Sequence, residues 1–241
     1  MSFKSKHDFF SLTTNGSGGA TGLVITDSNE NKAATTVQAQ NEKGDYVAWE
    51  VFAETLSPDC SYAVKSNVTL GSIKCGTVIA GTGDYATKKF TLGSITINTA
   101  AGSAPTVSAS GEEIPADTVS TDCTYTFPAT TLSACHHAQI LWGAFSLSGT
   151  GCYLQSANYT AGGTISRATK DGETVAFDVI EGQLTASVTI TQTGNTAPTL
   201  TAGENWTITA PLTCSNPDSN YPSWTATLSR NLTHDVPVTN S

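Results

Sequence analysis

Residues 184–190 read Leu-Thr-Ala-Ser-Val-Thr-Ile, a strict alternation of apolar and small polar side chains. A period of two residues places alternate side chains on opposite faces of an extended strand. β-branched residues such as Thr, Val and Ile also pack well on a pleated sheet. This stretch therefore predicts a β-strand with one face toward a core and the other toward solvent.

The same alternation recurs along most of the chain. It is found at residues 46–52, 90–97, 175–179 and 206–209. Glycine, asparagine, aspartate and proline separate the runs, and Asp171-Gly172 is the strongest hairpin signal. Two helix candidates, residues 30–40 and 132–141, lack a clear cap and a stop signal. We therefore expect an all-β protein.

Composition excludes several other classes. The 241 residues include 40 Thr and 25 Ser but one Met, and good helix formers are too few for a long helical bundle. No apolar run approaches the roughly 18 residues that a membrane helix needs. The first ten residues lack the apolar core of a secretory signal. We expect a protein made in a cytoplasm, without membrane insertion.

The charge is negative and unevenly distributed. The formal net charge is −9; residues 1–89 carry 8 basic and 9 acidic groups, whereas residues 90–241 carry 3 and 11. Nucleic-acid binding depends on cationic side chains that displace counterions from phosphates. The second half would instead repel DNA and anionic membranes, which argues against a nucleic-acid-binding protein.

Several motifs recur at an offset near 92 residues. Trp-x-x-Phe begins at positions 49 and 142, and Ala-Pro-Thr begins at positions 104 and 197. Such self-similarity is typical of tandem structural units. We predict an N-terminal arm or loop, residues 1–40, followed by two homologous β-sandwich or barrel domains, residues 41–134 and 135–241. The Trp and Phe of each motif are expected to anchor a core, and the arm to pack on a neighbouring domain or subunit.

Four of the six cysteines occupy matched positions in the two predicted repeats. They are Cys60, Cys123, Cys152 and Cys214. Disulfides Cys60–Cys123 and Cys152–Cys214 would each lie within one domain. Free thiols that pack as small apolar groups are the alternative, and the absence of a secretory signal favours it.

Signatures of catalysis and metal binding are weak. Cys135, His136 and His137 are adjacent, and neighbouring side chains on a strand point to opposite faces, so they do not converge easily on one ion. The chain has no GxSxG, HExxH, GxxxxGK[ST] or GxGxxG motif in a suitable context. We expect no enzyme activity, no metal and no cofactor.

A short N-terminal arm followed by two similar β domains resembles the duplicated tail-tube and tail-hub proteins of long-tailed bacteriophages. This resemblance implies a non-enzymatic virion structural protein, made in the host cytoplasm. It further implies that three chains build a pseudo-sixfold ring and that rings stack by β-sheet augmentation. The partners would be copies of the chain and other virion proteins, with DNA passing through the channel without sticking.

In such a ring the channel wall would be acidic, because like charge leaves a passing polyanion no binding wells. The candidate channel carboxylates are Glu112, Glu113, Asp117, Asp122, Asp171, Glu173, Asp178 and Glu181.

A different function class stays open. The chain would be a capsid decoration protein, or a receptor- or glycan-binding adhesin of tandem immunoglobulin-like domains. Trp206, Tyr221 and Trp224 lie close in sequence and would offer rings for sugars to stack on. Core packing is the simpler interpretation of Trp206. The sequence leaves tube, hub and decoration protein unresolved, together with the oligomer number.

Overall fold

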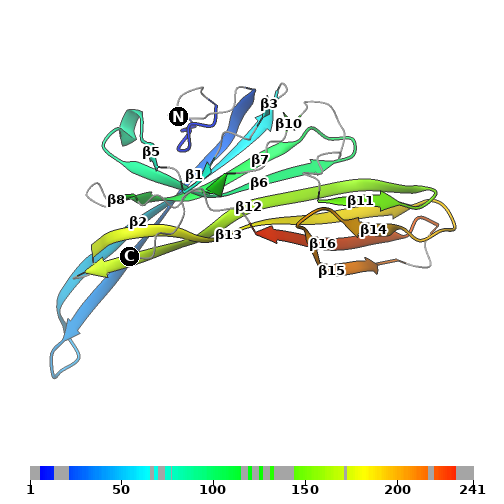
Figure 1. The fold of residues 1–241 in the computed structure, drawn as a ribbon. Helices are drawn as coiled ribbons and strands as arrows, with labels where there is room; N and C mark the ends of the chain where they lie inside the picture. The colour runs from blue at the N-terminus through cyan, green and yellow to red at the C-terminus, as the bar shows by residue number, and fades with distance from the viewer. Residues whose placement is uncertain are drawn as a thin grey trace, which may run out of the picture.

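The computed structural model describes residues 6–13, 22–65, 68–69, 74–76, 78–114, 119–120, 125–126, 131–132, 144–170, 173–216 and 220–231. Within these ranges the regular structure is almost entirely β; a single 3₁₀ turn, Gly83–Tyr85, is the exception (Figure 1). The all-β prediction is therefore confirmed.

One large sheet dominates the described part of the chain and contains ten strands. Its main path runs, neighbour by neighbour, through β1 (Leu23–Gln40), β2 (Tyr46–Val64), β7 (Thr106–Ile114), β6 (Lys89–Ala100), β12 (Cys152–Lys170), β13 (Glu173–Gln192), β16 (Ser223–Asn231) and β15 (Thr207–Cys214). All pairs on this path are antiparallel.

Shorter strands complete the β structure. Off the main path, β5 (Val78–Ala80) pairs with β6, and β8 (Val119–Ser120) pairs in parallel with β13. Separate two-stranded ladders are β3 (Val68–Thr69) with β10 (Thr131–Leu132), β4 (Lys74–Cys75) with β9 (Tyr125–Thr126), and β11 (Phe145–Ser148) with β14 (Thr199–Ala202).

The two halves of the main path have the same strand order. The first half reads β1-β2-β7-β6 and the second reads β12-β13-β16-β15, with all neighbours antiparallel in both. They meet where residues 94–100 of β6 pair with residues 156–162 of β12. The halves therefore share one continuous sheet. The predicted boundary at 134/135 lies outside the described residues, and the division into two domains stays a prediction.

The matched sequence motifs do not fall on equivalent strands of this repeated order. The Ala-Pro-Thr motif at position 104 leads into β7 of the main sheet, whereas the motif at 197 leads into β14 of a separate ladder. Strand β1 corresponds to β12 in the order, and these strands begin at residues 23 and 152, much further apart than 92 residues. The repeat in strand order and the repeat in sequence motifs therefore relate the two halves of the chain at different residue offsets.

Residues 1–40 differ from the expected arm. Residues 23–40 form strand β1, which pairs along its length with β2, so the boundary at 40/41 falls at a hairpin turn. The helix candidate over residues 30–40 is wrong, because pairing with β2 outweighs a weak helix propensity. Phe9, Phe10 and Leu12 are buried in the core of the first half. This segment is therefore part of the fold.

The core follows a row of side chains that face each other directly from strand to strand. Its members are Ile25, Tyr62, Val107, Ile97, Tyr159, Ala186, Leu228 and Ile208, in the order of the sheet. The six inner members are 0% exposed. One apolar face therefore runs without interruption through both halves of the sheet.

Different segments cover this apolar face in the two halves. In the first half, Phe9 packs on Phe90 with ring centroids 5.2 Å apart, and Tyr62 donates a hydrogen bond to Asp8 Oδ1 at 2.7 Å. In the second half, Phe145 of β11 is buried in the same core, and Leu200 of β14 packs against it. The molecule therefore has two layers, with the main sheet as the continuous one.

The hairpin of β1 and β2 extends beyond the body of the sheet. Strand β7 borders β2 only along residues 59–63, so residues 31–57 form a two-stranded ribbon that projects away in Figure 1. The side chain of Asn41 stabilises the turn by accepting hydrogen bonds from the amides of Lys43 and Asp45. A second hairpin joins β12 and β13, whose last pair is Lys170 with Glu173; the predicted turn residues Asp171-Gly172 lie between them, outside the described residues.

Candidate assembly surfaces

Strands β1 and β15 end the main path of the sheet, and within the described residues neither has a strand on its outer side. Unpaired edges of this kind are templates for pairing with another chain. Pro211 and two register shifts interrupt β15, so the regular part of this edge lies at its start, around Ile208. The two edges are the first candidate contact surfaces.

The apolar row reaches both of these edges. Ile208, on β15, is 36% exposed, whereas its inner neighbour Leu228 is fully buried. At the opposite end Ile25 of β1 is partly buried and packs against the core. The row therefore ends in an isoleucine at each edge, where a further strand would cover it.

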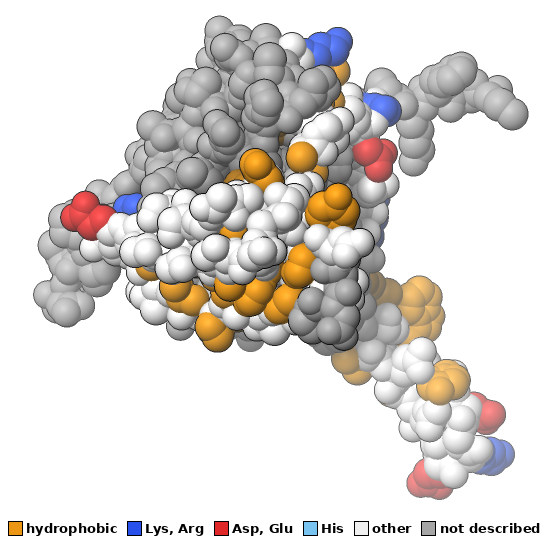
Figure 2. All heavy atoms as spheres, turned by 90° about the vertical axis from the view of Figure 1, so that its right-hand side faces the viewer, with side chains coloured by type: hydrophobic (Ala, Val, Ile, Leu, Met, Phe, Trp, Pro, Cys, Tyr) orange, Lys and Arg blue, Asp and Glu red, His pale blue; other side chains and the backbone are white. Residues whose placement is uncertain are grey.

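The projecting ribbon, residues 31–57, carries large apolar side chains in contact with solvent. They are Val37, Tyr46, Val47, Trp49 and Val51. Trp49 is 71% exposed, and Figure 2 shows hydrophobic side chains along the ribbon with charged ones at its tip. Exposed apolar groups gathered on one element mark an interaction site. The expectation that Trp49 anchors a core is wrong, because no described segment covers β2 at this point.

The face of the main sheet opposite the core is lined by small polar side chains. One row across the strands contains Asp27, Ser61, Ser108, Thr96, Thr160, Thr185, Ser229 and Thr207, and the next contains Val24, Ala63, Thr106, Asn98, Asn158, Ser187, Thr227 and Ala210. We call these two rows the hydroxyl face. Its members bond to one another in places, as between Thr96 Oγ1 and Thr160 Oγ1 at 3.0 Å.

Two of the predicted channel carboxylates are engaged in ion pairs, and the clustering of all eight into one acidic wall stays a prediction. Glu112 forms an ion pair with Arg167, and Glu113 forms one with Lys88 at 2.8 Å. Three others lie on β13, at positions Glu173, Asp178 and Glu181. Asp117, Asp122 and Asp171 lie outside the described residues.

The three aromatic residues of the alternative function do not form a cluster. Trp206 is 6% exposed and belongs to the core, as the simpler interpretation held. Trp224 donates a hydrogen bond from Nε1 to Gln192 Oε1 at 2.9 Å, and Tyr221 is exposed in the preceding turn. Five residues of β16, or roughly 17 Å, separate Trp224 from Ser229, which pairs with the residue after Trp206.

Cys60, Cys152 and Cys214 are free thiols. Cys152 lies on β12 and Cys214 on β15, with β13 and β16 between them. Three strand spacings amount to about 14 Å, twice the Cα separation that a disulfide allows. The structure therefore does not bring the Cys152–Cys214 pair together, and Cys123 lies outside the described residues. Burial raises the pKa of Cys60 to about 11.

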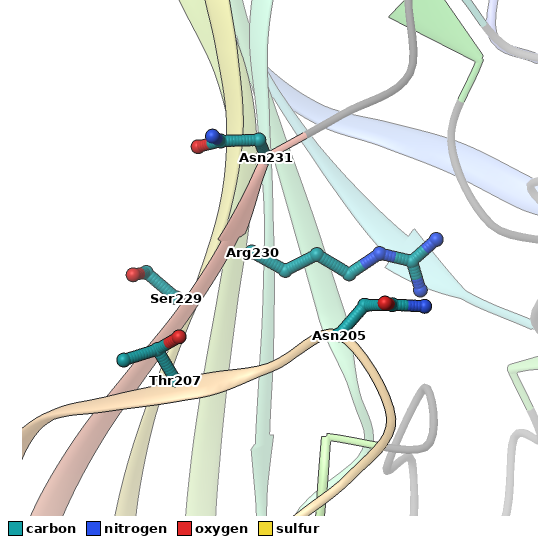
Figure 3. A pocket seen from close by; sticks show the side chains of 5 residues that line it. All are labelled: Asn205, Thr207, Ser229, Arg230 and Asn231. Atoms are coloured by element: carbon teal, nitrogen blue, oxygen red, sulfur yellow. The ribbon is translucent and has the colours of Figure 1, made fainter.

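A polar pocket of about 430 Å³ lies at the β15 edge. Asn205, Thr207, Ser229, Arg230 and Asn231 line it, and Figure 3 shows Arg230 and Asn205 pointing to one side while the other three point to the opposite side. These groups do not converge on one ligand. Across the described ranges there is no cluster of three or more metal-ligating side chains, and no helix there has the length and hydrophobicity to cross a membrane.

Comparison with known proteins gives no relative from which a role could be transferred. No protein-family model matches the chain, and no curated protein matches it significantly. The sheet edges, the ribbon and the hydroxyl face are therefore the features that bear on function.

Proposed function

We propose that the chain is a non-enzymatic structural subunit that assembles edge to edge into rings, as a tail-tube-type protein of a virion. One observation carries the proposal. The two open edges, β15 and β1, are the counterparts in strand order of β6 and β12, the pair that joins the two halves within the chain. Pairing β15 with β1 of the next copy would repeat that internal junction.

Such a contact is head to tail, since one copy offers β15 and the next offers β1. Contacts of this type close into a ring or continue as a helical filament. If the register of the internal junction is kept, Ile208 lies opposite Ile25 of the next copy, as Tyr159 lies opposite Ile97. Both isoleucines would then lose contact with water, which stabilises the ring.

The ribbon supplies a second contact surface for stacking or for other virion proteins. It projects from the sheet and carries Trp49, Tyr46 and Val47, each more than half exposed. Burying these side chains on a neighbouring ring would offset the cost of exposing them in the monomer. The net charge of −9 supports a surface to which DNA does not adhere.

The first test is the assembly state of the purified chain over a range of concentrations, measured by light scattering on a sizing column and by negative-stain microscopy. We expect rings or stacked tubes with a central channel. A chain that stays monomeric throughout, or forms a small spike-like trimer, would contradict the proposal and favour the decoration or adhesin alternative.

Substitutions on the two edge strands test whether β15 of one copy pairs with β1 of the next. Ile208→Lys and Ile25→Glu should each block assembly, because a charge on an edge strand opposes pairing with another strand. A chain with both changes should assemble again, since the ammonium and carboxylate groups would face each other across the junction. Ser146→Lys is the matched control, because it adds the same charge at an exposed position of β11, away from both edges.

A further inference from the structure

The two faces of the main sheet are not equivalent in any closed ring. The apolar face is already covered by residues 6–13 in the first half and by the β11–β14 ladder in the second. These segments add a second layer on that side. Because an inner circumference is shorter than an outer one, the side with the extra layer belongs on the outside of a ring.

The hydroxyl face is therefore left for the interior. We propose that this face, rather than the clustered carboxylates expected from the sequence, lines the channel of the ring; this inference rests on the proposed function. From β7 to β16 both rows consist of Ser, Thr and Asn, and Asp27 of β1 is the one charged member of the two rows. Asn158, Ser187 and Thr106 are among the members most open to solvent.

The expected diameter of a ring of three chains allows a polymer such as DNA to pass through it. Three chains would contribute about 24 strands from the main path, and at a spacing of about 4.8 Å the backbone circle would be roughly 37 Å across before strand tilt. Barrels of 16–18 strands already leave an aqueous channel. Across the middle strands of the two rows the wall would be wet and lined by short side chains.

The chemistry of this wall suits transit of DNA. A phosphate backbone binds proteins through cationic side chains that release its counterions, and the two rows contain none. Hydroxyl and amide groups form hydrogen bonds with water as readily as with a phosphate. They therefore offer the duplex no preferred binding position along the channel. The carboxylates Glu112 and Glu113 are neutralised locally by Arg167 and Lys88, so low affinity would come from the absence of cations more than from a repulsive wall.

Thiol labelling with reagents of two sizes tests which face is inside. Ser187→Cys lies on the hydroxyl face and Ser146→Cys on the outer β11 ladder, both at exposed positions. In assembled particles a small maleimide should modify both variants, whereas a maleimide carrying a bulky polyethylene glycol should modify Ser146→Cys alone. Labelling is counted as the mass increment over the unsubstituted chain, because that chain already contains thiols.

The same labelling in the Ile208→Lys background supplies the monomer control, in which both reagents should modify both variants. If the bulky reagent modifies Ser187→Cys equally in particles and monomers, the hydroxyl face is outside and the inference is overturned while ring formation stands. If light scattering shows that the unsubstituted chain forms no particles, the proposed function fails and the inference falls with it.

A charge variant tests the weak interaction with DNA. Assembled unsubstituted chain should retain no short fluorescent duplex in sedimentation at low salt. Ser187→Lys particles should retain it, with retention lost as salt rises. Retained duplex should resist nuclease, unlike duplex held by Ser146→Lys particles. Equal nuclease sensitivity in the two variants would place residue 187 on the outer surface and refute the inference.

Discussion

Ile97 lies directly opposite Tyr159 at the centre of the pairing between β6 and β12, and both side chains are fully buried. This contact joins the first half of the chain to the second within one sheet. Because the apolar row continues through it in both directions, the stability of either half depends on the junction.

Ile97→Ala should therefore destabilise both halves. Loss of a buried isoleucine side chain to alanine costs about 2–5 kcal/mol. Denaturant unfolding should show this loss, and hydrogen exchange should show weaker protection in residues 184–190 as well as in β6. Ile208→Ala, at the exposed edge of the same row, is the control and should cost less. Unchanged protection in residues 184–190 would mean that the halves are energetically independent.

Tyr62→Phe should loosen the segment at residues 6–13. The Tyr62 hydroxyl donates to Asp8 Oδ1, and Asp8 Oδ2 accepts a hydrogen bond from the amide of Thr13 at 2.8 Å. Removing the hydroxyl leaves a half-buried carboxylate with one fewer donor, at a cost of about 1–3 kcal/mol. Amide protection at Thr13 should fall with the free energy of unfolding. Tyr46→Phe, whose ring is 64% exposed, should change neither quantity.

The stability of the fold should decrease between pH 9 and pH 11. The thiol of Cys60 has an ordinary pKa of 9.0 and burial raises it to about 11, so the unfolded chain loses this proton first as the pH rises. The stabilisation is complete below pH 9 and is lost toward pH 11, by about 3 kcal/mol at most. Urea unfolding of Cys60→Ala should show a shallower decline over this interval. Burial also raises the pKa of Tyr62, which adds a decline of the same sign in both proteins.

Cys152 and Cys214 should remain unlinked under mild oxidation. They lie on strands separated by two others in the sheet, and both thiols are partly exposed. Digestion after alkylation of the native protein should yield each peptide with its own alkyl group. A peptide pair joined through these two residues would require a rearranged sheet and would contradict the described strand order.

Trp49→Ala should weaken assembly without changing the stability of the folded chain. Its side chain is 71% exposed, so the free energy of unfolding should change by no more than about 0.5 kcal/mol. Under the proposed function, stacking of rings into tubes should weaken while single rings persist, as seen by microscopy. Leu56→Ala, at a buried position further along β2, should instead cost about 2–5 kcal/mol. Tubes of normal length from Trp49→Ala would exclude the ribbon as a stacking contact.

The all-β class and the two faces of individual strands could be predicted from the sequence alone. In residues 184–190 the buried members are those that the alternation assigns to the core, Leu184, Ala186, Val188 and Ile190. The hairpin of β12 and β13 could also be predicted, because Asp171-Gly172 is a local turn signal between two alternating runs. These features depend on the directions in which successive side chains leave an extended backbone, which is a local property.

The tertiary structure alone decided which strands are neighbours and which alternating faces are covered. Residues 46–52 alternate much as residues 184–190 do, yet Trp49 is exposed, because apart from β1 no described strand or layer reaches that part of β2. The continuity of the two halves, the open edges at Ile25 and Ile208 and the polar rows of the hydroxyl face all arise from pairing between distant segments. Burial depends on these long-range contacts, whereas the alternation of side chains along one strand does not.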